Sequence, residues 1–70
     1  MTKEQAKLLA MTGAGEKIKH QKGGVYTVVG FCRVQIKGLW EEAIQYTNGN
    51  YIYVRLLSDC EKLSLVTEQK

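Results

Sequence analysis

The sequence predicts a mainly β domain, a small five-stranded barrel preceded by a short N-terminal helix. Three observations predict this fold. The chain has 70 residues, which is enough for one domain and no more. After Gly15 it contains short runs of β-branched and aromatic residues with turn residues between them, the pattern of a small barrel. Before Gly15 its apolar residues recur at helical spacing. We expect a single domain over 1–70, with the helix in 1–13 and the barrel in 16–67.

The helix is predicted from its ends as well as from its apolar face. Thr2 is a suitable N-cap, and Gln5 three residues later completes a capping box. One face carries Ala6, Leu9 and Ala10. Gly13 then ends the helix. Because a helix of about ten residues is marginal alone, we expect it to dock on the strands.

The strand over 25–29 is the clearest, because its residues are β-branched or aromatic throughout. We expect it to continue through a bulge or bend at Gly30 as far as Ile36. Further strands are expected over 16–20, 39–47, 50–57 and 62–67.

The register of one hairpin follows from Asn48-Gly49, a strong signal for a two-residue turn. Such a turn pairs Thr47 with Asn50, which sets the other pairs. These are Tyr46 with Tyr51, Ile44 with Tyr53, Glu42 with Arg55, and Trp40 with Leu57. The opposite face is aliphatic near its middle and is predicted to be the core, with Leu39, Ala43, Ile52, Val54 and Leu56.

The aromatic face of this hairpin is the predicted site for a protein partner or for self-association. Tyrosine, tryptophan and arginine are the residues that dominate binding hot spots. The candidate residues are Trp40, Tyr46, Tyr51, Tyr53 and Arg55. The alternative is that the N-terminal helix lies across this face, with Leu8 and Leu9 covering the rings.

Charge suggests a second kind of partner. The net charge is +3, and the segment from Lys17 to Trp40 contains five cations and no acid. These cations are Lys17, Lys19, Lys22, Arg33 and Lys37. Basic patches attract polyanions, so the alternative function is nucleic-acid binding by the 17–37 segment. The competing interpretation is that these side chains only solvate the surface.

No catalytic, cofactor or metal site is predicted. His20 is the only histidine, and with two cysteines it falls short of the four ligands of a structural zinc site. We expect Cys32 and Cys60 to be reduced, because a small secreted domain usually carries several disulfides. No apolar run approaches the roughly 18 residues of a membrane span, so we expect a cytoplasmic protein with no membrane partner.

Residues 18–30 read Ile-Lys-His-Gln-Lys-Gly-Gly-Val-Tyr-Thr-Val-Val-Gly. This segment resembles a small bacterial and phage family of uncharacterised function, with matches at His20, Lys22, Gly23, Tyr26, Val28 and Gly30. Tyr53-Val54-Arg55 stands where that family has Trp-Val-Arg, but Leu56 replaces its proline. The resemblance implies an SH3-like barrel in a bacterial or phage setting and implies no activity. The sequence as a whole predicts a non-enzymatic interaction module, with protein binding favoured over nucleic-acid binding.

Overall fold

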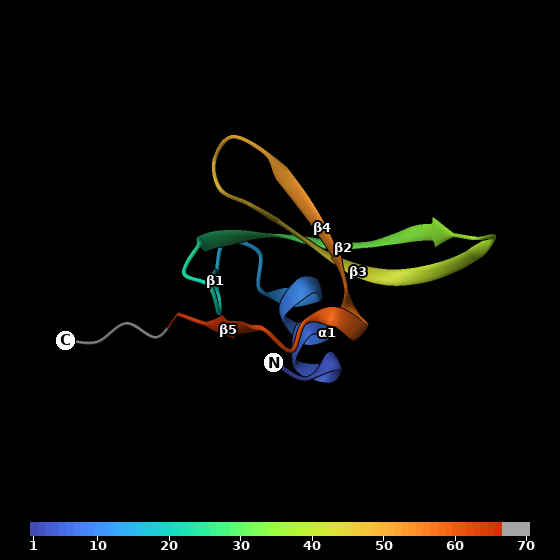
Figure 1. The fold of residues 1–70 in the computed structure, drawn as a ribbon, viewed down its shortest axis with the longest axis horizontal. Coiled ribbons are helices and arrows are strands. Elements are labelled where there is room, and N and C mark those ends of the chain that lie inside the picture. The colour runs from blue at the N-terminus through green and yellow to red at the C-terminus, as the bar shows by residue number, and fades with distance from the viewer. Residues whose placement is uncertain (67–70) are drawn as a thin grey trace.

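The computed structural model describes residues 1–66, which form one helix and one antiparallel sheet of five strands (Figure 1). The elements in chain order are α1 (Lys3–Thr12), β1 (Lys17–His20), β2 (Val25–Ile36), β3 (Leu39–Thr47), β4 (Ile52–Leu56), the 3-10 helix η1 (Leu57–Asp59) and β5 (Leu63–Leu65). The strand order is β4-β3-β2-β1-β5. The predicted mainly β fold with an N-terminal helix is confirmed. The sheet curls around α1 but does not close, so β4 and β5 remain its two edges. The end of the last predicted strand, Thr67, lies outside the described residues.

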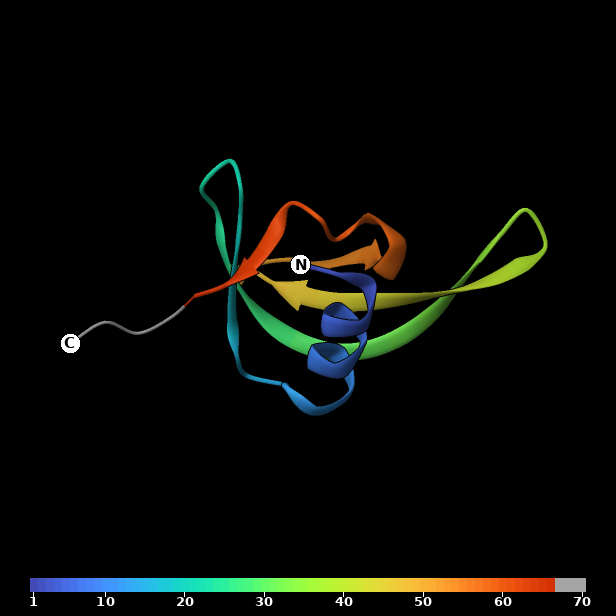
Figure 2. The same cartoon turned by 90° about the horizontal axis from the view of Figure 1, so that it is seen from below.

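Helix α1 begins and ends as predicted. The Thr2 hydroxyl accepts a hydrogen bond from the Gln5 amide, and the Gln5 side chain accepts one from the Thr2 amide. The helix packs under the curled sheet (Figure 2) through its smallest side chains, because Ala6 and Ala10 are buried in the core. Leu8 instead points outward and is 66% exposed.

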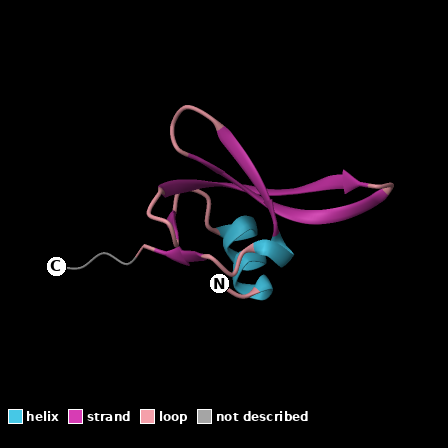
Figure 3. Ribbon diagram, in the orientation of Figure 1, coloured by secondary structure: helices cyan, strands magenta, loops and turns pink. Residues whose placement is uncertain are grey.

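Strand β2 organises the sheet because it is long enough to pair with strands on both sides. Its first residues pair with β1, and the rest of the strand pairs with β3. The register shifts between Val28 and Gly30, which confirms the irregularity predicted there. Residues 33–42 pair only across the β2–β3 hairpin, because β4 joins β3 no further than Ala43. This two-stranded extension, here called the β2–β3 arm, projects from the body (Figure 3).

The predicted register of the β3–β4 hairpin is wrong by two residues. Thr47 pairs with Ile52 rather than with Asn50. The cause is side-chain hydrogen bonding that favours a longer loop. The Asn48 Oδ1 accepts bonds from the amides of Asn50 and Tyr51, at 2.8 and 2.9 Å, and the Thr47 hydroxyl donates to the Tyr51 carbonyl at 2.7 Å. Because strand side chains alternate with a period of two, a shift of two leaves each residue on its predicted face.

The predicted choice of the core face is also wrong. Ile44 is fully buried and Tyr46 is 5% exposed, whereas Ile52 and Val54 on the other face are 62% and 48% exposed. The helix, η1 and β5 all contribute buried residues to the Tyr46 side, so the core forms there. Leu39 is exposed as well, and only Ala43 on the predicted core face is fully buried.

Two predicted cross-strand pairs, Glu42 with Arg55 and Trp40 with Leu57, are wrong because the register is shifted by two and β4 joins β3 no further than Ala43. Glu42 forms an ion pair with Lys7 of the helix, at 3.2 Å, instead of one with Arg55. Trp40 lies opposite Gln35 rather than Leu57.

The two cysteines are free thiols in different environments. Cys60 is buried in the core, and its thiol donates to the Leu56 carbonyl at 3.3 Å. Cys32 is half-buried in the middle of β2. In the part of the chain that the structure describes, no helix is long and apolar enough to cross a membrane.

Candidate partner-binding recess

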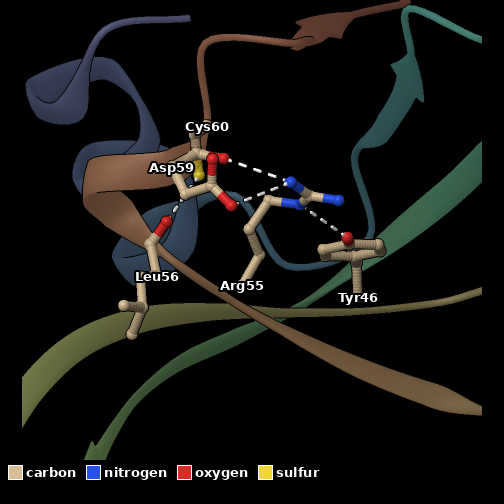
Figure 4. A network of polar contacts seen from close by, with 5 residues as sticks. All are labelled: Tyr46, Arg55, Leu56, Asp59 and Cys60. Carbon is tan, nitrogen blue, oxygen red and sulfur yellow. Dashed lines mark hydrogen bonds and ion pairs between the residues drawn. The ribbon is translucent and has the colours of Figure 1, made fainter.

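Arg55 of β4 is held in place by two neighbours that lie on opposite sides of its guanidinium (Figure 4). Its Nε donates to the hydroxyl of Tyr46 on β3, at 3.0 Å. Its Nη1 donates to the carboxylate and to the backbone carbonyl of Asp59 in η1, at 3.2 and 3.3 Å. The hydrogen bond to Tyr46 is the main cause that raises the pKa of Arg55, so the side chain is a permanent cation. These contacts fix the position of its charge.

Three tyrosine rings pack beside this arginine. Tyr26 of β2 meets Tyr46 and Tyr53 edge to face, with ring centroids 5.1 and 5.7 Å apart. Tyr46 and Tyr53 are 5.8 Å apart. Tyr51 extends the group from the hairpin loop, 6.5 Å from Tyr53 and 69% exposed. The cluster therefore runs from a buried ring, Tyr46, to an exposed one.

The turn between β1 and β2 forms the opposite wall. The His20 Nδ1 accepts a hydrogen bond from the Lys22 amide at 3.0 Å, and the His20 carbonyl accepts one from the Gly23 amide at 2.8 Å. Gly24 then lies directly against the ring of Tyr26. A Cβ at Gly24 would come within 2.5 to 2.9 Å of the hydroxyl and ring atoms of Tyr26, so glycine is what allows this close approach.

Together these groups form an open recess of about 460 Å³. Its lining residues are His20, Lys22, Gly24, Tyr26, Tyr46, Tyr53 and Arg55. The lining contains an arginine, a lysine, a histidine and no acidic residue. The recess can therefore offer hydrogen-bond donors and aromatic edges to a ligand that carries negative charge.

Trp40 does not belong to this recess. It lies on the β2–β3 arm, is 65% exposed, and borders a different recess of about 350 Å³. That second recess is lined by Lys3, Arg33, Trp40, Glu41, Glu42 and Ser58. Of the five predicted partner-binding residues, the structure thus gathers Tyr46, Tyr51, Tyr53 and Arg55 and leaves Trp40 apart.

The five predicted nucleic-acid-binding cations are spread over the molecule. Lys17 and Lys19 alternate with the buried Ile18, so they point away from the core side of β1. Lys22 lies in the turn before β2, whereas Lys37 lies in the turn after it. The twelve residues of β2 separate those two turns by at most roughly 40 Å, at about 3.3 Å per residue. Arg33 lies on the arm, opposite Glu42.

The helix covers part of the aromatic side, as the alternative interpretation expected, but through other residues. Ala6 and Ala10 are its buried contacts, whereas Leu8 is exposed and Leu9 is partly buried against the core. The tyrosines beside Arg55 still line the open recess.

The second wall of the recess was not predicted to belong to the protein-binding site. Its residues His20, Lys22 and Tyr26 belong to the segment that carries the family resemblance, and that pattern was the available signal. No sequence pattern indicated that Asp59 would bind Arg55, because this contact depends on the turn of η1 that follows β4.

Within residues 1–66 there is no group of three or more His, Cys, Asp or Glu side chains that could hold a metal ion. Comparison of the chain with known protein families, curated proteins and solved structures finds no match.

Proposed function

We propose that this domain is a non-enzymatic interaction module that binds a protein partner through the recess around Arg55. The observation that carries the proposal is an arginine fixed by Tyr46 and Asp59 at the edge of an open tyrosine cluster. Binding hot spots are enriched in tyrosine and arginine. A side chain that is already fixed loses less conformational entropy when a partner binds, which favours affinity.

The fold supports an SH3-like arrangement for this module. The strand order brings β5 beside β1, and the long β2 contributes to both halves of the curled sheet, as in a small barrel that is open between β4 and β5. The family resemblance centred on residues 18–30 covers the β1–β2 turn that forms one wall of the recess. It supports a bacterial or phage setting, and we propose that the module acts in the cytoplasm.

Nucleic-acid binding by Lys17, Lys19, Lys22, Arg33 and Lys37 has less support from the geometry. Nucleic-acid grooves combine a continuous track of cations with aromatic faces on which bases stack. Here the cations lie on different sides and at opposite ends of β2. The alternative predicts binding that weakens steeply with salt, which a titration with single-stranded DNA tests directly.

A photo-crosslinking experiment tests the protein-binding proposal. A benzoylphenylalanine replaces Tyr51, whose ring lies beside Tyr53 of the recess, and, as a matched control, Leu8 on the outer side of α1. The two positions are 69% and 66% exposed. In cells that carry the gene, we expect the Tyr51 position to capture a discrete protein and the Leu8 position to capture none. Equal capture at both positions would contradict a specific site at the recess.

Binding of that purified protein then tests the role of Arg55. We expect Arg55→Ala to weaken binding about tenfold to thirtyfold, which corresponds to about 1.4 to 2 kcal/mol. Lys37→Ala removes the same charge at the tip of the arm and should leave binding within about a factor of two. Binding that is unaffected by Arg55→Ala would refute the proposed site.

A further inference from the structure

One end of the Arg55 guanidinium is unused. Its Nε is bonded to Tyr46, and its Nη1 is bonded to Asp59. Among residues 1–66 its Nη2 has no hydrogen-bond partner, and in Figure 4 this nitrogen points away from Asp59, on the side of Tyr46. An arginine presents five N–H donors in a planar fork, so two donors remain in a fixed direction. The Arg55 side chain lines the recess and is 25% exposed, so part of it is open to a ligand.

The surroundings favour a negatively charged acceptor. Lys22 and His20 line the same recess, and none of the residues that line it is acidic. Asp59 offsets part of the charge of Arg55 but lies outside the lining. A carboxylate accepts hydrogen bonds from a guanidinium in its own plane, and such charge-assisted bonds are about twice as strong as neutral ones.

The aromatic residues favour a peptide over a nucleic acid as the source of that charge. Bases bind single rings by stacking on an open face. Here Tyr26, Tyr46 and Tyr53 are packed against one another, with interplanar angles of 67° and 81° at the two contacts of Tyr26, and Tyr46 is 5% exposed. These three rings, which line the recess, thus offer edges and hydroxyl groups rather than a stacking platform.

We propose that the recess recognises a glutamate or aspartate side chain in an acidic segment of a protein partner. The carboxylate accepts hydrogen bonds from Nη2 of Arg55, and Lys22 supplies the second positive charge. This inference rests on the proposed function, and it specifies which chemical group of the protein partner binds in the recess. Asp59 acts as a positioning residue, because it holds the guanidinium from outside the lining, whereas Tyr46 holds it from within the lining.

The test is an NMR titration of the full chain. The probes are an acetylated and amidated tetraglutamate peptide, its tetraglutamine counterpart and an eight-nucleotide oligothymidylate, all at the same ionic strength. We expect tetraglutamate to shift the Arg55 Nε–H signal and the amide signals of Lys22 and Gly24 in a saturable way. Tetraglutamine should shift none of them. Saturation by oligothymidylate at a lower concentration than tetraglutamate would overturn the choice of a peptide.

Variants separate a specific site from general attraction between charges. Arg55→Gln should weaken tetraglutamate binding about tenfold or more, the size expected for losing a hydrogen bond to a charged group. Lys37→Gln makes the same change in net charge at the far end of β2 and should leave the affinity within a factor of about two. Equal weakening by both variants would show that the attraction is diffuse and would overturn the proposal.

Two further measurements keep the test decisive. Arg55→Lys keeps the charge but loses the fork, and we expect it to weaken binding as well, because lysine cannot bond Tyr46 and Asp59 and also present two free donors. The dispersion of the amide spectrum checks that each variant is folded. A partner protein that is crosslinked at the recess, but binds unchanged when its acidic residues become amides, would leave the proposed function standing and refute this inference.

Discussion

Removal of the Tyr46 hydroxyl isolates one of the two contacts that fix Arg55. The hydroxyl accepts a hydrogen bond from the Arg55 Nε at 3.0 Å, and Tyr46 is 5% exposed. A hydrogen bond to a charged group contributes about 1.5–3 kcal/mol. Because the Arg55 side chain is 25% exposed, water replaces part of this bond in Tyr46→Phe. We therefore expect a loss of about 1–1.5 kcal/mol in the free energy of unfolding.

Thermal unfolding measures this loss. In a domain of this size, 1 kcal/mol corresponds to a change of about 4–8 °C in Tm, so Tyr46→Phe should lower Tm by roughly 5–10 °C. The matched control is Tyr51→Phe, because Tyr51 is 69% exposed and its hydroxyl has no hydrogen-bond partner among residues 1–66. The control should change Tm by less than about 2 °C, as expected for a surface substitution.

The same variant tests the link between the Tyr46 contact and the recess. Without Tyr46, the Arg55 side chain keeps only Asp59 as a partner, so more of its conformational freedom is lost on binding. We expect tetraglutamate affinity to fall by about twofold to fivefold in Tyr46→Phe, a loss that comes on top of the unchanged charge of the recess. Equal Tm values for Tyr46→Phe and Tyr51→Phe would refute the reasoning, because they would show that the hydrogen bond contributes nothing to the fold.

Three other predictions concern the fold. Ile44→Ala should destabilise the domain by about 2–5 kcal/mol and Ile52→Ala by less than about 1 kcal/mol, since only Ile44 is buried. Denaturant unfolding measures both losses, and equal losses would contradict the assignment of the core face. Gly49→Val should cost about 1 kcal/mol or more, because Gly49 has a φ of +100°; an unchanged Tm would speak against this loop conformation. Burial raises the pKa of the Cys60 thiol, so in the folded protein at pH 8 a disulfide reagent should modify Cys32 at least about tenfold faster than Cys60. After denaturation the same reagent should titrate two thiols. Equal rates for the two cysteines in the folded protein, or fewer than two thiols after denaturation, would count against this.

Local signals in the sequence predicted the local structure well. The capping box at Thr2 and the irregularity at Gly30 depend on neighbouring residues, and both are confirmed. The register after Thr47 was wrong because Asn48-Gly49 matches a two-residue turn equally well. The hydrogen bonds of Asn48 to the amides of Asn50 and Tyr51 decide between the two loops, and no turn pattern records them.

The choice of the core face needed information that alternation does not contain. The alternation of strand side chains places Ile44 and Ile52 on opposite faces of the hairpin, but it does not determine which of the two faces the helix covers. The large Leu8 suggested a helix face that the structure leaves in solvent, whereas the small Ala6 and Ala10 make the contact. Small residues allow a helix to approach a sheet closely, and this signal is weak in a hydrophobicity pattern.

The candidate site was predictable in part for a similar reason. Tyr46, Tyr53 and Arg55 share one hairpin, so alternation alone placed them on one face. The wall that contains His20 and Lys22 comes from a different turn, and it meets them only through the curl of the sheet. Trp40 shares their face but lies six residues from Tyr46 along β3, too far to join the same recess.

The β2–β3 arm is expected to open more readily than the rest of the sheet. Residues 33–42 have no third strand beside them, and an isolated two-stranded ribbon is marginally stable in water. At its tip, Lys37 has a φ of +51°, a conformation that costs a lysine free energy and that asparagine adopts more readily. We therefore expect amide protons in the arm to exchange with solvent through local openings, and those near the buried Val28 and Tyr46 to exchange more slowly. Tyr46, Arg55 and Asp59 lie outside the arm, so we expect a local opening of the arm to leave their hydrogen bonds in place.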